Sequence, residues 1–281
     1  MNWKQLISAK RFGMEEFHEE RQENRSEFQR DYDRLIFSAP FRRLQNKTQV
    51  FPLPGSVFVH NRLTHSLEVA SVGRSLGDDV AKALLERHPE LQDSFLPEIG
   101  SIVSAACLAH DLGNPPFGHS GEKAISTFFS EGKGVRLKEK QPNGEQLSPM
   151  EWEDLTHFEG NANAFRILTH QFEGRRKGGF VLTYTTLASI VKYPFSSSLA
   201  GTKSKFGFFV SEEESFQKIA TELGLTLLNE HPLKYARHPL VYLVEAADDI
   251  CYQMMDIEDA YKLKILTTEE TKELLLSLIH I

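Results

Sequence analysis

Residues 105–124, AACLAHDLGNPPFGHSGEKA, place a histidine and an aspartate directly after an apolar run, followed by two prolines and a second histidine. The helical spacing of this run puts His110 on the same face as Val103, so His110 is predicted to point inward. Asp111 then follows the negative C-terminal end of the helix, where a carboxylate is unfavourable. We therefore expect a compensating cation or donor nearby.

The composition is typical of a folded protein that does not bind nucleic acid mainly through a basic surface. The chain has 281 residues, of which 40% are hydrophobic and 25% charged, and its formal net charge is −7. No apolar run reaches the roughly 18 residues of a membrane span, and the N-terminus is not a signal peptide. A cytoplasmic protein without membrane contact is predicted, with Cys107 and Cys251 as buried free thiols.

Helical periodicity runs through most of the chain and predicts an all-α fold. An apolar stripe in phase with His65 comprises Val69, Val72, Leu76, Val80 and Leu84. Residues 130–150 are polar and predicted to form an exposed excursion, while residues 180–186 and 206–210 are candidates for short strands or a hairpin. The expectation is therefore a helical bundle with at most a small β-hairpin.

Asp248 is a second unusual carboxylate. It lies within the apolar stripe that Val244 and Cys251 help to form, and Tyr252 and Asp256 continue its face at the next two helical steps. An ionised carboxylate in a core position is costly unless a cation or hydrogen bonds compensate.

Three separate helices therefore contribute His65, His110, Asp111 and Asp248 to inward or helix-end positions. Imidazoles and carboxylates suit a divalent metal such as Mn, Mg, Fe, Co, Ni or Zn. A cation at their centre would compensate for both unusual carboxylates. Any one of these residues alone would be read as structural, so the prediction rests on the joint pattern.

A second histidine follows the prolines and has a carboxylate three residues further on. Pro115 and Pro116 end the preceding helix, and Ser120 is predicted to cap the next one, with His119 at its mouth. A carboxylate such as Glu122 orients an imidazole and raises its basicity, as a general acid or base requires. The alternative is a helix-start glutamate favoured by the dipole.

The order of these residues resembles the HD-domain metallohydrolases. Within this family, the sequence around these residues resembles the deoxyguanosine triphosphate triphosphohydrolase-like enzymes, which cleave dNTPs into deoxynucleoside and triphosphate. The matching segments, in order, are FRRLQNKTQVFP, HNRLTHSLEVA, HDLGNPPFGHSGE, HFEGNANAFRIL, TLASIVKYP, KFGFF and EAADDICYQMMDIEDA. They span about residues 30–262, within a single HD-type domain expected over residues 1–281.

The resemblance implies a role for each matching residue. His65, His110, Asp111 and Asp248 would hold the metal, and His119 with Glu122 would form the catalytic pair. Substrate contacts would come from Gln49 and Val50 near the base, from Tyr252 and Asp256 near the deoxyribose, and from Arg62, Asn114, His157, Lys192, Tyr193 and Lys205 at the phosphates.

The implied substrate is a dNTP, with dGTP as the first guess, cleaved at the α-phosphate. A triphosphate carries about four negative charges, so an acidic protein that hydrolyses it has to gather cations locally. The resemblance also implies a homo-oligomer and admits single-stranded nucleic acid as a partner. Members of the family usually continue past the point where this chain stops, so a truncated chain is expected.

Two other functions remain open at this stage. An HD-type phosphohydrolase of nucleotide monophosphates or cyclic phosphodiesters would keep the metal set. It would not need Lys192 and Tyr193, Lys205, or the face of Tyr252 and Asp256. A nucleotide-sensing or single-strand-binding module would bind without turnover. The products formed from a dNTP separate these functions from the first.

Overall fold

The computed structural model describes residues 2–16, 25–49, 60–139, 145–174, 176–201 and 205–279. The α-helices are α1 (Trp3–Leu6), α2 (Glu27–Ile36), α3 (Ala39–Arg43), α4 (Arg62–Arg87), α5 (Ile99–Ala109), α6 (Gly118–Ser130), α7 (Pro149–Thr156), α8 (Gly160–Thr169), α9 (Tyr184–Ile190), α10 (Glu213–Glu222), α11 (Val241–Lys262) and α12 (Thr268–Ile279). Short 3₁₀ segments are η1 (Leu44–Asn46), η2 (Pro89–Leu91), η3 (Leu96–Glu98), η4 (Lys133–Lys138), η5 (Ser197–Leu199) and η7 (Val210–Glu212). The predicted all-α class is confirmed.

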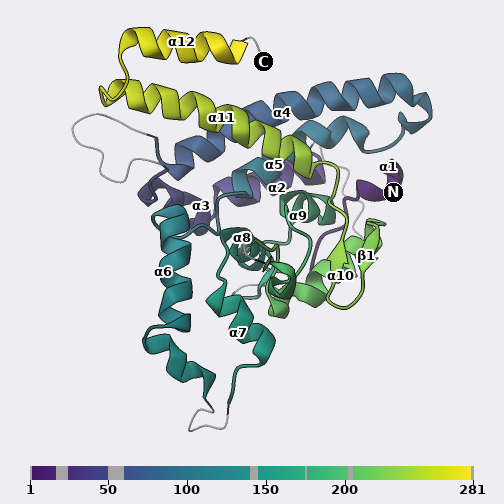
Figure 1. The fold of residues 1–281 in the computed structure, drawn as a ribbon. Helices are drawn as coiled ribbons and strands as arrows, with labels where there is room; N and C mark the ends of the chain where they lie inside the picture. The colour runs from purple at the N-terminus through teal and green to yellow at the C-terminus, as the bar shows by residue number, and fades with distance from the viewer. Residues whose placement is uncertain are drawn as a thin grey trace.

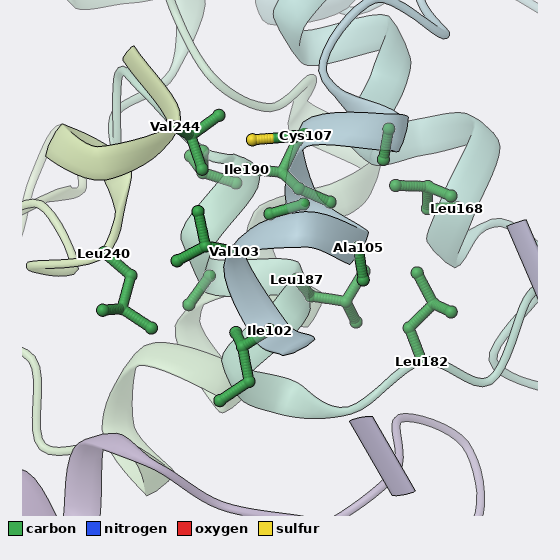
Figure 2. Packing of buried hydrophobic residues seen from close by; sticks show 14 of the residues in the cluster. Ile102, Val103, Ala105, Cys107, Leu168, Leu182, Leu187, Ile190, Leu240 and Val244 are labelled. Atoms are coloured by element: carbon green, nitrogen blue, oxygen red, sulfur yellow. The ribbon is translucent and has the colours of Figure 1, made fainter. Parts of the chain in front are cut away.

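Helix α5 is the centre of the bundle. Every one of its residues is buried, and it contacts α2, α4, α9 and α11. Figure 2 shows Ile102, Val103 and Cys107 of this helix among apolar side chains of the surrounding elements, including Leu187 and Val244. A helix that is apolar on all sides belongs in a core, as its sequence predicted. Both cysteines are buried and free, as expected.

The outer helices lie at two ends of the bundle. Helices α11 and α12 lie along one edge together with the long α4, whereas α6 and α7 extend away at the opposite end (Figure 1). None of the helices in the described ranges combines the length and the apolar character needed to cross a membrane.

Small residues bring α4 and α5 unusually close together. A methyl group added at Gly77 would lie 2.7 Å from the Cα atom of Gly100, and one added at Gly73 would lie 2.6 Å from the Sγ atom of Cys107. The most buried row of α4 therefore consists largely of small residues, whereas Val72, Leu76, Val80 and Leu84 of the predicted stripe are only half-buried. Val69 of the predicted stripe is fully buried, and Val72, Leu76 and Leu84 pack partly buried against the core, because close helix contact needs small side chains and larger ones lie beside the contact line.

The β-structure lies in a different place from the prediction. Two short antiparallel strands, β1 (Leu227–Asn229) and β2 (Lys234–Tyr235), form the sheet of the described chain. Residues 180–186 are not a strand, because Thr183 caps α9 by accepting a hydrogen bond from the amide of Thr186. Residues 206–210 form a loop whose Phe206 and Phe209 pack in a small apolar cluster. Apolar content predicted strands there, but packing of the side chains decided otherwise.

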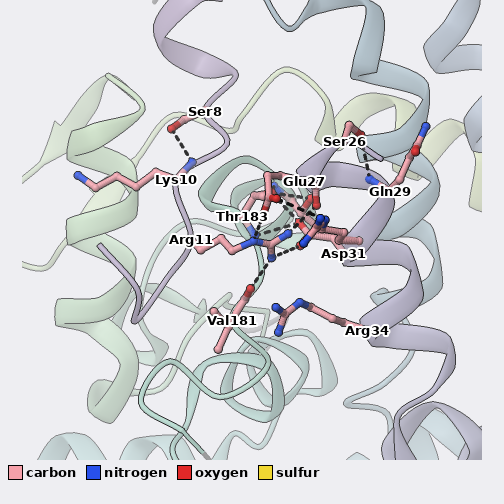
Figure 3. Close-up of polar contacts among 12 residues, drawn as sticks. Ser8, Lys10, Arg11, Ser26, Glu27, Gln29, Asp31, Arg34, Val181 and Thr183 are labelled. Atoms are coloured by element: carbon pink, nitrogen blue, oxygen red, sulfur yellow. Dashed lines mark hydrogen bonds and ion pairs between the residues drawn. The ribbon is translucent and has the colours of Figure 1, made fainter. Parts of the chain in front are cut away.

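A buried polar cluster ties the N-terminal segment to the bundle (Figure 3). The Arg11 guanidinium donates to Asp31 Oδ1 at 2.7 Å, to the Val181 carbonyl at 2.6 Å and to the Glu27 backbone and carboxylate. Asp31 Oδ2 accepts from the amide and the hydroxyl of Thr183. Burial raises the pKa of Asp31, against the opposing effects of Arg11 and Thr183. The hydrogen bonds and ion pairs of this cluster connect α2, the N-terminal segment and the start of α9.

Candidate metal centre and cavity

His65 is positioned by the start of α4. Asn61 caps this helix, and its side chain accepts hydrogen bonds from the amides of Leu63 and Thr64, with Thr64 completing a capping box. This cap sets the rotation of the first turn, so that His65 points into the protein and is fully buried.

His110 and Asp111 follow the C-terminal end of α5, as predicted. His110 is the C-cap residue, and its Nδ1 atom lies 2.6 Å from the Cys107 carbonyl. A carbonyl only accepts, so Nδ1 carries the proton and Nε2 is left facing the carboxylates of Asp111, at 3.7 Å, and Asp248, at 3.5 Å. Burial lowers the pKa of His110, but Asp111 and Asp248 outweigh it and raise the pKa to about 9.

Asp248 reaches the two histidines from α11. Its Oδ1 atom lies 2.9 Å from His65 Nε2. Burial alone would raise the pKa of Asp248, but His110 and then His65 hold it well below its usual range. The side chain is 35% exposed, so the predicted core position is wrong in detail: Asp248 lies at the wall of a cavity and not inside the core.

The donor set fits a divalent cation. Ligand atoms of His65, His110 and Asp111 all lie within 4.8 Å of one another, and Asp248 contacts both histidines. Two imidazoles and two carboxylates match the preferences of several divalent metals. The structure therefore brings three of the four predicted metal ligands into one cluster, and the fourth, Asp248, contacts both histidines of that cluster.

His119 and Glu122 lie in the first turns of α6. His119 Nδ1 is 2.7 Å from Glu122 Oε2, and Glu122 Oε1 accepts from the Gly160 amide at 2.8 Å. Glu122 is buried, whereas the His119 side chain is 85% exposed. Ser120 is not the cap that the sequence predicted, because α6 begins at Gly118 after a left-handed Phe117. The helix therefore starts three residues earlier than a Ser120 cap implies, and it includes His119.

A cavity of about 460 Å³ joins these groups. His110, Asp111, Asp248, His119 and Glu122 all line it. Predicted substrate contacts that also line it are Gln49, Arg62, Asn114, Lys192, Tyr193, Lys205 and Tyr252. Three of the four predicted metal ligands, the His119 and Glu122 pair and most of the expected binding residues thus face one space, while His65 is buried behind them.

Among the described residues, two predicted substrate contacts, His157 and Asp256, do not line this cavity. His157 follows the end of α7 and pairs with Glu153 at 3.1 Å. Asp256 is half-buried and hydrogen-bonds Tyr252, and burial raises the pKa of its carboxyl group. Val50 lies outside the described residues.

Each predicted phosphate-binding cation is paired with a carboxylate. Arg62 Nη1 lies 2.6 Å from Asp111 Oδ2, and Lys205 Nζ lies 2.8 Å from the buried Glu159. Lys192 Nζ lies 2.9 Å from Glu245. Sequence reasoning missed these two glutamates as members of the cavity wall, although both stand inside motifs that carried the resemblance, HFEGN and EAADD. Neighbouring carboxylates keep these cations in place while they share the cavity.

Comparison with known proteins identifies the class. The HD domain profile matches residues 62–177, which include His65, His110, Asp111, His119 and Glu122. Residues 62–177 therefore match the HD domain, the domain that the resemblance predicted. This class supports a divalent metal at the histidine and aspartate cluster.

More particular similarity extends along nearly the whole chain. A deoxyguanosinetriphosphate triphosphohydrolase-like protein of Pseudomonas aeruginosa (strain LESB58) is 46% identical over 99% of this chain and 61% of its own length. A like-named protein of Synechocystis sp. is 43% identical over 100% of this chain and 64% of its own length. A deoxyguanosinetriphosphate triphosphohydrolase of Yersinia enterocolitica is 36% identical, over 96% and 57%. The chain thus spans about three fifths of the length of these relatives.

Proposed function

We propose that this protein is a metal-dependent dNTP triphosphohydrolase, with dGTP as the first substrate to test. The observation that carries the proposal is the convergence of His65, His110, Asp111 and Asp248 beside a cavity that also contains His119 paired with Glu122. The names of its relatives support the same activity.

The cavity has the charges that a nucleoside triphosphate requires. Arg62, Lys192 and Lys205 line it, and an acidic chain needs such a local group of cations to bind about four negative charges. The proposed metal ligands are His65, His110, Asp111 and Asp248, and the metal is one of Mn, Mg, Fe, Co, Ni or Zn. A divalent cation held there would place positive charge against a phosphate oxygen and the attacking water.

The proposed chemistry of the chain centres on His119. Its Nδ1 atom donates to Glu122, which leaves Nε2 free to take a proton from water or to give one to the leaving oxygen. A bond forms between the water oxygen and the α-phosphorus, and the bond from phosphorus to the 5′-oxygen breaks. The proton passes to the 5′-oxygen, so the products are a deoxynucleoside and an intact triphosphate.

Product analysis tests the proposal. Purified full-length protein is incubated with each dNTP and with several divalent metals, and the products are separated by chromatography. His119→Ala removes the proposed proton-transfer group, and His88→Ala is the matched control because His88 lies on the surface beside Glu90. We expect intact triphosphate from the wild type and from His88→Ala.

Other product patterns would contradict the proposal in different ways. Release of phosphate from nucleotide monophosphates or opening of cyclic phosphodiesters, without triphosphate from dNTPs, would indicate the alternative phosphohydrolase. Binding of dNTPs without turnover under any of the metals would indicate a sensing module. Equal triphosphate release by wild type and His119→Ala would show that the site is assigned wrongly.

We also propose that the protein works in the cytoplasm as a homo-oligomer formed from one HD-type domain per chain. The exposed apolar side chains of α11 and α12, among them Met254, Leu274 and Leu276, support an assembly surface there. Light scattering of the full-length protein at several concentrations measures the oligomeric state. A monomer at all concentrations would contradict this part of the proposal.

A further inference from the structure

The turn that leads into α6 contains a strained residue at the cavity. Phe117 adopts φ 66° and ψ 20°, in the left-handed region, and Gly118 follows with φ 52°. Glycine adopts such angles freely, but a residue with a Cβ atom pays a steric penalty. Val181 and Lys264 share this feature among the described non-glycine residues, yet of the three only Phe117 lines the cavity.

The side chain of Phe117 adds a second unfavourable feature. It is 64% exposed and belongs to neither apolar core cluster of the described chain. A strained backbone and a solvated phenyl ring at one residue bring no benefit to the free protein that glycine would not also bring. Strain of this kind concentrates at functional sites, where a ligand or a mechanism uses it.

The position of the ring indicates what it meets. Phe117 lines the cavity together with the cationic groups Arg62, Lys192 and Lys205, and the Arg62 guanidinium reaches Gly118, the residue next to it. A phenyl face has nothing to offer phosphate oxygens, but it stacks on the flat face of a nucleobase. The left-handed turn places this exposed phenyl residue at the cavity.

We propose that Phe117 is a substrate-binding residue whose ring stacks on the nucleobase of the bound nucleotide. This inference rests on the proposed function, since it takes a nucleoside triphosphate as the ligand. Its ring contributes to binding of the nucleoside part and leaves the binding of the triphosphate part unaffected.

Equilibrium binding tests the inference without relying on turnover. The full-length, metal-loaded protein in a His119→Ala background is titrated calorimetrically with dGTP and, separately, with inorganic tripolyphosphate. Phe117→Ala is expected to weaken dGTP binding roughly tenfold, the usual effect of losing one stacking partner, and to leave tripolyphosphate binding unchanged. Phe37→Ala is the matched control, because Phe37 is 72% exposed at the end of α2 and does not line the cavity.

Two further variants separate the ring from the backbone. Phe117→Gly is expected to bind dGTP as weakly as Phe117→Ala does. Its unfolding temperature is expected to be at least as high as that of Phe117→Ala, because glycine carries no left-handed penalty. Phe117→Trp is expected to keep dGTP affinity and to show tryptophan fluorescence quenched by dGTP and not by tripolyphosphate.

Several results would overturn the inference. They are unchanged dGTP binding in Phe117→Ala, an equal loss for dGTP and tripolyphosphate, or unquenched fluorescence in Phe117→Trp. Failure of the proposed function looks different. In that case dGTP binding depends on the ring, which supports the inference, while the wild type releases no triphosphate from any dNTP.

Discussion

Two polar clusters lie inside this helical bundle, and they differ in how completely their atoms are paired. Around Arg11 and Asp31, both carboxylate oxygens of Asp31 accept hydrogen bonds, and the guanidinium is held by two carboxylates and two carbonyls. The cluster is closed, because each strong donor meets an acceptor within the protein. Its residues connect segments of the chain, and none of them lines the cavity beside His110 and Asp248.

The cluster around His110 and Asp248 is incomplete by the same standard. His65 Nδ1 and Arg62 Nε lack partners within the described residues, and the Asp111 and Asp248 carboxylates share the His110 imidazole beside a cavity. Buried polar groups that are crowded by charge and left partly unpaired need a ligand to complete them. Incomplete pairing, and not burial or charge alone, distinguishes the proposed functional cluster from the structural one.

The largest expected effect tests the incompletely paired cluster around His110 and Asp248, which we call the open cluster. His110→Ala removes one of four proposed metal ligands, and we expect triphosphate release to fall by on the order of a thousandfold or more, since positioning and charge stabilisation carry phosphoryl transfer. Metal content after dialysis should fall together with the rate. Chromatographic assays and elemental analysis measure both, and normal metal content with normal turnover would refute the assignment of His110 as a ligand.

The closed cluster should respond in stability and not in activity. Arg11→Met leaves the buried Asp31 without its cation, and we expect a loss of about 3–5 kcal/mol in the free energy of unfolding. Urea denaturation measures this loss, and the double variant Arg11→Met/Asp31→Asn should recover part of it. Reduced turnover by the folded Arg11→Met protein would break the distinction between the two clusters.

A third buried group, His238, predicts how stability depends on pH. Its Nε2 atom donates to the Leu6 carbonyl and its Nδ1 atom accepts from the Leu240 amide. Both ring nitrogens of the neutral imidazole therefore have hydrogen-bond partners. Burial lowers its pKa to about 4, against the opposing hydrogen bond to Leu6. Between about pH 6.5 and pH 4 the unfolded chain binds a proton that the folded chain does not, so stability falls by about 3 kcal/mol as the pH drops through this window.

The control for this pH effect is His238→Gln, which keeps a donor for Leu6 but does not titrate. Its unfolding free energy should fall less steeply than that of the wild type between pH 6.5 and pH 4. Equal slopes in urea melts of the two proteins would mean that His238 does not hold its neutral form in the fold.

The smallest expected effect concerns the pair next to the open cluster. In Glu122→Gln, the amide oxygen still accepts a hydrogen bond from the Gly160 amide. The group that faces His119 Nδ1 is then an uncharged amide nitrogen, which cannot accept a hydrogen bond. We expect turnover to fall by about a hundredfold with little change in thermal stability. Steady-state kinetics of Glu122→Gln beside Glu90→Gln, a surface control, measures it, and unchanged turnover would remove Glu122 from the mechanism.

The sequence predicted much of the open cluster because its members occupy unfavourable places along the chain. His110 and Asp111 end an apolar helix, and Asp248 interrupts an apolar stripe, so each stands out without knowledge of its neighbours. That these residues meet in space could be predicted only from their combination, because each residue alone would be read as structural. The roles of these residues stay predictions until the variants above are measured.

Other features of the cavity were not predictable in this way. Glu159 and Glu245 look like ordinary surface glutamates in the sequence, and the left-handed turn at Phe117 has no signal in a stretch where Pro and Gly admit several conformations. The hairpin was placed on apolar runs that instead pack as a helix start and a loop. Short apolar segments do not distinguish strands from other buried structure.

By itself, the sequence determined the helical class of this protein and the chemical types of the groups at its centre, because periodicity and helix-end chemistry act over a few neighbouring residues. Only the tertiary structure decided which groups meet, which ones share a cavity and which carboxylate holds each cation. Those pairings depend on how closely distant segments pack, as at the contact of Gly77 with Gly100, where a single methyl group would be too large. Local sequence carries no measure of that distance.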